Sequence, residues 1–208
     1  MSDDQLTVET NEWATAEHAT AYLERAHLIP RRDTGYDELL ALLPERPRRV
    51  LDLGTGNGQV LDLIAAPGVA LDFSPAMLDA ARARFAGRPD VEVVDHNLNA
   101  ALPDMGWFDV VVSAFAIHHC PDERKRALYA EVFECLEPGG LFANLEHVSS
   151  PTKRLHEQFL ALLNAPEDPS NQLLDVETQL GWLREIGFVD VECFWKWREM
   201  ALLAGVKP

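Results

Sequence analysis

The chain has 208 residues, 47% hydrophobic and 25% charged, a composition typical of one globular domain with a well-buried core. Its formal net charge of −16 repels polyanions, which disfavours nucleic acid as the main partner. The acidic N-terminus is unlike a secretory signal, and the apolar runs are too short for a membrane span. The three cysteines match no metal-ligand spacing and read as free thiols in a reducing compartment. We therefore expect a soluble, cytoplasmic protein without a membrane anchor.

The first 45 residues read as an N-terminal helical cap or lid. The stretch from 11 to 43 carries helix-forming residues and the aromatic side chains Tyr22 and Tyr36, and nothing in it has the pattern of a strand. We therefore expect a cap on residues 1–45 and one main domain on residues 46–208.

Short apolar runs alternate with amphipathic stretches from residue 46 onward. The pattern predicts strands at 48–54, 68–74, 90–97, 107–116 and 140–148, and helices at 59–67, 75–87 and 121–140. Such alternation favours right-handed βαβ units around a parallel sheet, with helices on both faces.

The chain changes character after residue 149. Two helices at 150–164 and 174–188 surround a proline-rich loop, and we expect this insertion, about 149–186, on the substrate side. Two extended runs, 189–197 and 199–207, are joined too tightly for a parallel crossover and should pair antiparallel. The predicted architecture is a doubly wound α/β sheet of seven strands, mostly parallel with an antiparallel final strand.

Three glycines alternate directly after the first predicted strand, at Gly54, Gly56 and Gly58. The dinucleotide fingerprint would need a glycine where Gln59 stands, so the spacing argues against a pyrophosphate ligand. Glycines here still allow close approach of backbone to a ligand, with helix N-terminal amides facing an anionic group. A plain tight turn is the structural alternative.

Acidic residues end the next two predicted strands. Asp72 lies about twenty residues beyond the glycine loop, where a carboxylate can accept hydrogen bonds from the hydroxyls of an adenosine ribose. Asp95 could accept one from an adenine amine. Either residue alone is weak evidence, because Asp72 could equally serve the N-terminus of the following helix. Three consecutive strand ends with suitable chemistry are stronger evidence for an adenosine ligand.

The segments VLDLGTGNG, LDFS, VVDHNL, WFDVVVSAFAIHHCPD and LEPGGLFANLEHV resemble the class I S-adenosylmethionine-dependent methyltransferases, over roughly residues 46–208. The resemblance implies a Rossmann-like fold and S-adenosyl-L-methionine as cofactor, with S-adenosyl-L-homocysteine as product. The cofactor contacts that it implies are Asp52, Gly54, Thr55, Gly56, Gly58, Asp72, Phe73, Met77, Asp95, His96, Asn97 and Ala114.

The acceptor side carries histidines where two strands end. His118 and His119 follow the fourth strand, and Glu146 and His147 end the fifth. A histidine there could take a proton from a hydroxyl, and His118 and His147 are our main candidates for the base. The alternative is that these side chains only hydrogen-bond the backbone. No third ligand is placed by spacing, so we predict no metal.

We expect a small, partly apolar acceptor walled by Tyr22, Tyr36, His156 and Phe159, although each aromatic alone could be ordinary core. The predicted function is methyl transfer to a small-molecule acceptor, with oxygen preferred over nitrogen or carbon, by a monomer or homodimer. The Asn-Pro-Pro signature of relatives that methylate amides or base amines is absent, which disfavours DNA adenine and protein glutamine. A non-catalytic S-adenosylmethionine-binding regulatory protein, a tRNA or protein methyltransferase, and a disfavoured NAD oxidoreductase are the alternatives.

Overall fold

The computed structural model describes residues 29–208, so Tyr22 and most of the predicted cap lie outside the described residues. The described strands are β1 (Val50–Leu53), β2 (Gly68–Asp72), β3 (Val91–Asp95), β4 (Phe108–Ala114), β5 (Leu136–His147), β6 (Val189–Trp197) and β7 (Met200–Val206). The described helices are α2 (Arg32–Leu42), α3 (Gln59–Ile64), α4 (Pro75–Arg84), the 3₁₀ turn η2 (Ile117–His119), α5 (Asp122–Cys135), α6 (Lys153–Leu163) and α7 (Val176–Ile186).

The seven strands form one sheet in the order β3-β2-β1-β4-β5-β7-β6. Strand β7 pairs antiparallel with β5 and with β6, and the other neighbouring pairs are parallel. The predicted mixed sheet with an antiparallel final strand is confirmed. The strand order reverses between β1 and β4, and in open sheets of this type the crevice at such a reversal is where ligands bind.

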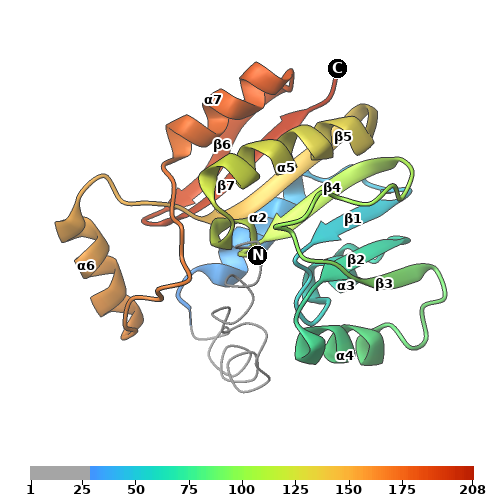
Figure 1. The fold of residues 1–208 in the computed structure, drawn as a ribbon, viewed down its shortest axis with the longest axis horizontal. Coiled ribbons are helices and arrows are strands. Elements are labelled where there is room, and N and C mark those ends of the chain that lie inside the picture. Colours follow the sequence, from blue (N-terminus) through green and yellow to red (C-terminus); the bar gives the residue numbers. More distant parts are fainter. Residues whose placement is uncertain (1–28) are drawn as a thin grey trace, which may run out of the picture.

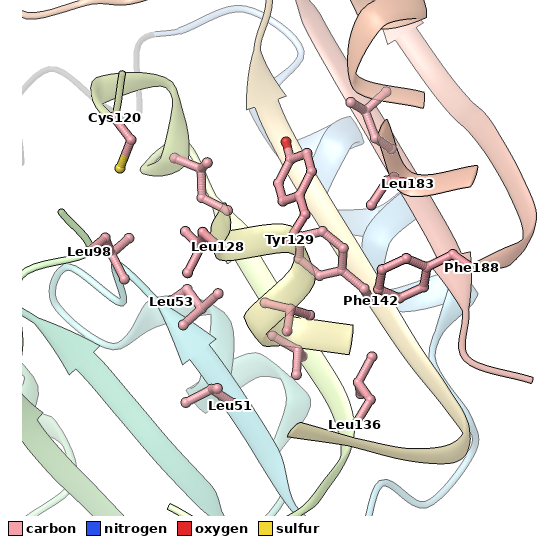
Figure 2. Packing of buried hydrophobic residues seen from close by; sticks show 14 of the residues in the cluster. Leu51, Leu53, Leu98, Cys120, Leu128, Tyr129, Leu136, Phe142, Leu183 and Phe188 are labelled. Carbon is pink, nitrogen blue, oxygen red and sulfur yellow. The ribbon is translucent and has the colours of Figure 1, made fainter. Parts of the chain in front are cut away.

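Helices cover both faces of the sheet (Figure 1). One hydrophobic cluster packs α5 and α7 against the sheet and includes Tyr129, Phe142 and Phe188 (Figure 2). The other cluster packs α2, α3 and α4 against the opposite face. Strands β1 and β2 are buried along their whole length, which explains why they read as continuous apolar runs.

Helices α2 and α7 belong to the helical layers that pack on the two faces of the sheet. Tyr36 and Leu39 of α2 are buried against the sheet, and Leu180 and Leu183 of α7 are buried beside α5. Figure 1 shows α6 standing apart from the sheet, whereas α7 lies along it. Within the predicted insertion at 149–186, α6 and its flanking loops are therefore the part that leaves the body of the domain.

The boundary between α5 and β5 differs from the prediction of a helix over 121–140. Helix α5 ends at Cys135, and Leu136 already pairs with Phe108 as the first residue of β5. Leu136 is fully buried, and Pro138 has no N–H with which to continue a helix. Burial of Leu136 on the sheet therefore ends the helix early.

Candidate functional site

The glycine loop joins β1 to α3 at the strand-order reversal. Gly54, Gly56 and Gly58 all have positive φ, at 67°, 56° and 81°. A β-carbon added at Gly54 would lie 2.2 Å from the β-carbon of Ala116, which follows β4. The ends of β1 and β4 can therefore approach this closely only because residue 54 is glycine.

Two buried carboxylates meet this loop. Asp52 is 1% exposed and accepts a 2.6 Å hydrogen bond from the Thr55 hydroxyl at Oδ2, while its Oδ1 makes no hydrogen bond of normal geometry within residues 29–208. Burial raises the pKa of Asp52 to about 7, although the Thr55 hydrogen bond opposes the rise. A buried, half-satisfied carboxylate of this kind is suited to a cationic ligand group.

Asp72 has a structural task as well as its predicted one. Its two oxygens accept the backbone N–H of Gly56 at 2.8 Å and that of Ser74 at 2.9 Å. Burial raises the pKa of Asp72, and these backbone hydrogen bonds oppose the rise. The Asp72 carboxylate thus fixes the glycine loop relative to the start of α4.

A cavity of about 200 Å³ opens beside the loop. The predicted cofactor residues that line it are Asp52, Gly54, Thr55, Gly56, Asp72, Phe73, Met77, His96, Asn97 and Ala114. Gly58 and Asp95 are not among its described lining residues. Gly58 instead precedes α3, and the Asp95 side chain is exposed, so beyond β3 the wall runs from His96 to Asn99.

Arg32 and Phe115 also line the cavity, and the sequence reasoning missed both. Arg32 is 8% exposed, donates from Nε to the Tyr36 hydroxyl at 2.8 Å, and has its guanidinium 4.5 Å from the Phe115 ring centre. Among the described lining residues it is the one arginine or lysine. Phe115 has φ 56°, which is rare for a bulky residue and commonest at functional sites. Nothing in the sequence separates Arg32 from the neighbouring arginines.

His118 and Glu146 form a buried pair behind the cavity. His118 Nδ1 lies 2.6 Å from Glu146 Oε1, and that oxygen also accepts the His147 N–H at 2.8 Å. Burial raises the pKa of Glu146 to about 7 and lowers the pKa of His118 well below its ordinary value. Both groups therefore favour their neutral forms more than they would in water.

His119 is the one predicted catalytic residue among those described as lining the cavity. Burial lowers its pKa to about 3, and its Nδ1 lies 3.1 Å from the Ser170 hydroxyl. Its ring lies against that of His118, with centres 4.0 Å apart. The loop bearing Ser170 thus contacts a residue of the cavity wall, although it is far away in the sequence.

The predicted substrate residues divide between two places. Tyr36 lines the first cavity, whereas His156 lines a second cavity between α6 and residues 167–173. Phe159 is 2% exposed and packs on His147 and Trp197, with ring centres 5.6 and 6.2 Å apart. Tyr22 is not within the described residues.

His147 and His156 share a carboxylate that the sequence analysis did not identify. Glu199, at the turn between β6 and β7, lies 3.0 Å from His147 Nε2 and 3.1 Å from His156 Nδ1. Its side chain is fully buried. No sequence signal pointed to Glu199, because its partners lie 52 and 43 residues away along the chain.

Two negative findings apply to residues 29–208. These residues contain no group of three histidine, cysteine, aspartate or glutamate side chains arranged to hold a metal ion. None of their helices combines the length and the apolar character that a membrane-spanning helix needs.

Comparison with known proteins gives a consistent result. Residues 50–140 match a methyltransferase domain family. The chain is 30% identical over 173 residues to demethylmenaquinone methyltransferase from Clavibacter sepedonicus, covering 73% of this chain and 70% of that protein. It is 35% identical over 132 residues to trans-aconitate 2-methyltransferase from Methylobacterium radiotolerans, covering 57% and 46%. An O-methyltransferase family protein from Burkholderia thailandensis shares the fold, with TM-score 0.70 at 22% identity, covering 91% of this chain and 58% of that one.

Proposed function

Because this chain belongs to the class I S-adenosylmethionine-dependent methyltransferase family, we propose that it transfers the methyl group of S-adenosyl-L-methionine to a small-molecule acceptor, with oxygen preferred over nitrogen or carbon. When bound, this cofactor supplies an electrophilic methyl group on a sulfonium. The observation that carries the proposal is the cavity at the β1–β4 reversal, where two buried carboxylates and one buried arginine converge.

The residues of the cavity fit the polar groups of this cofactor. The Oδ1 atom of Asp52 offers a buried acceptor for its ammonium group, and the Arg32 guanidinium offers a cation for its carboxylate. Each oxygen of Asp72 accepts one backbone N–H and keeps a second lone pair for a ribose hydroxyl. Phe73 and Met77 supply apolar surface for the adenine.

The histidines beyond the cavity support a hydroxyl acceptor. Methylation of a hydroxyl oxygen releases a proton, and an uncharged imidazole next to a carboxylate can take it. His118 is held neutral by burial and is paired with Glu146, and His147 lies beside it with ring centres 5.5 Å apart. These two histidines remain our candidates for the base.

The cofactor proposal is tested by thermal shift with S-adenosylmethionine, S-adenosylhomocysteine and NAD in parallel. A ligand at 100 times its dissociation constant stabilises the native state by about 2.7 kcal/mol. For a chain of this length that corresponds to roughly 5–11 °C in melting temperature. We expect a rise with the two adenosyl ligands and none with NAD. A rise with NAD alone would overturn the proposal.

The acceptor is tested with methyl-labelled cofactor against four groups of compounds. The panel holds phenols and hydroquinones, small di- and tricarboxylates, bulk tRNA, and a protein extract. We expect label in one of the first two groups, which is also where the names of the relatives point. Label in tRNA or protein would replace the small-molecule assignment. Cofactor binding with no labelled product in any group would favour a non-catalytic binding protein.

A further inference from the structure

Glu199 is a fully buried carboxylate that pairs with two histidines. It lies at the turn between the last two strands, and its described ion pairs are both with histidines. His147 reaches it from the end of β5 through Nε2, and His156 reaches it from α6 through Nδ1. A buried carboxylate needs such donors, since water does not reach it.

The charge of Glu199 decides which ring nitrogens carry protons. Burial raises the pKa of Glu199, but hydrogen bonds from His147, Ser150 and His156 outweigh it, so the pKa lies below its ordinary value. An ionised carboxylate only accepts hydrogen bonds. Each imidazole therefore presents an N–H to Glu199, which is Nε2–H for His147 and Nδ1–H for His156.

The neighbouring pair has the opposite arrangement. His118 faces Glu146 with Nδ1, whereas His147 faces Glu199 with Nε2. The two rings stand edge to face with centres 5.5 Å apart. The hydrogen bond at one ring nitrogen determines the state of the other, so each carboxylate selects which nitrogen of its histidine is basic.

We propose that Glu199 is a positioning residue of the acceptor side, which holds His147 with Nε2 protonated and Nδ1 basic, and at the same time anchors α6 through the Nδ1–H of His156. The catalytic consequence rests on the proposed function: of the two ring nitrogens of His147, Nδ1 is then the one that can take a proton, and His118 remains the other candidate base. The geometry itself is independent of turnover.

The test is a two-bond ¹H–¹⁵N spectrum of the imidazole rings in the uniformly labelled full chain. The signals of His147 and His156 among the seven histidines are assigned by His147→Gln and His156→Gln. In the wild type we expect His147 to be protonated at Nε2 and not at Nδ1, and His156 to be protonated at Nδ1. A wild-type His147 protonated at Nδ1 alone would overturn the proposal.

Glu199→Gln sharpens the test, because an amide offers one acceptor and one donor in place of two acceptors. At least one of the two histidines should then move its proton to the other nitrogen. The matched control is Glu167→Gln, which alters an exposed carboxylate 3.5 Å from His156 Nε2 and should leave His147 unchanged. Unchanged spectra for both histidines in folded Glu199→Gln would also overturn the proposal.

Two further measurements keep the outcome clear. If Glu199→Gln fails to fold, His156→Gln serves instead: His147 must keep its Nε2 proton there, because Glu199 is still present, and its loss would contradict the proposal. Thermal shift with S-adenosylmethionine is run on every variant. If the wild-type spectrum is as expected but no acceptor in the panel is methylated, the proposed function fails while the role of Glu199 stands.

Discussion

A β-carbon placed on Gly54 would lie 2.2 Å from the β-carbon of Ala116, so the Gly54 backbone packs directly against the Ala116 side chain beside the cavity. Both residues line the cavity at the strand-order reversal. Ala116, beyond the end of β4, therefore constrains the backbone of the glycine loop at Gly54.

Gly54→Ala should therefore disrupt both stability and cofactor binding. The substitution adds a clash with Ala116 to a φ of 67°, and strained left-handed backbone costs about 1–3 kcal/mol by itself. The matched control is Gly181→Ala in α7, where an added β-carbon meets nothing within 4 Å and helix propensity should stabilise by about 0.5–1 kcal/mol. Urea unfolding measures both variants, and a Gly54→Ala protein as stable as the wild type would contradict this account of the loop.

Removing the charge of Asp52 should have opposite effects on stability and on cofactor binding. Its pKa is raised in the fold from 3.8 to about 7, so the folded chain binds this proton more tightly than the unfolded chain does. The contribution of this proton to the free energy of unfolding is therefore fully present below pH 4 and is lost as the pH rises through 7. This rise in the pKa corresponds to on the order of 4 kcal/mol of unfolding free energy.

Asp52→Asn should thus raise the ligand-free melting temperature at pH 8 and change it little at pH 4. The same variant should lose most of the thermal shift with S-adenosylmethionine, because the negative charge that faces the ammonium is gone. Melting curves at both pH values, with and without cofactor, check both effects. A variant less stable than the wild type at pH 8 would show that burial of the Asp52 charge is not costly.

Glu146→Gln should lower methyl transfer to the acceptor found in the panel by about 10²–10⁴-fold. Glu146 is not among the described lining residues of the cofactor cavity, so the cofactor thermal shift should persist. The carboxylate form stabilises a protonated His118, and burial raises the pKa of Glu146 to about 7, so wild-type turnover should rise as the pH passes through 7. Initial rates between pH 5.5 and 8.5 test this, and the same rise in Glu146→Gln would assign it to another group.

Lys125 ties α5 to the loop that contacts His119. It is 1% exposed, and its ammonium donates to Asp122 at 2.7 Å and to the Gln172 carbonyl oxygen. Lys125→Met should cost about 1.5–3 kcal/mol in unfolding free energy, since it removes the hydrogen bond that the buried ammonium donates to this loop. Lys153→Met is the control, because its pair with Glu157 is exposed and contributes little. Equal denaturation midpoints for the two variants would contradict the role given to Lys125.

The residues around the glycine loop could be predicted from the sequence for a physical reason. Parallel strands buried on both faces are continuous apolar runs, and their carboxyl ends meet at one edge of the sheet. The sequence alone therefore assigns Asp52 and Asp72 to one site, and both line the cavity. Asp95 shows the limit of this reasoning, because the end of a strand does not say which way its side chain points.

The histidine–carboxylate pairs could be predicted from the sequence only in part. Glu146 and His147 stand out because they end a strand, but their pairing with His118 and Glu199 was not predicted, since tertiary packing alone brings these pairs together. Arg32 was missed because a single arginine in a helix normally faces solvent. In the fold its guanidinium lies 5.4 Å from the Tyr36 ring centre and 4.5 Å from the Phe115 ring centre.

Glu199 lies far along the chain from the glycine loop and outside the segment that matches the family. The methyltransferase domain match ends at residue 140, yet the carboxylate that organises two acceptor-side histidines stands 59 residues later, at the turn between the last two strands. We therefore expect the residues around Glu199 to vary between relatives more than the glycine loop upstream, which lies within the family match. Under the proposed function, a chimera joined within β5 would take Tyr36 and His118 with the glycine loop from one parent and His156 and Glu199 from the other, so we expect its choice of acceptor to depend on both parents.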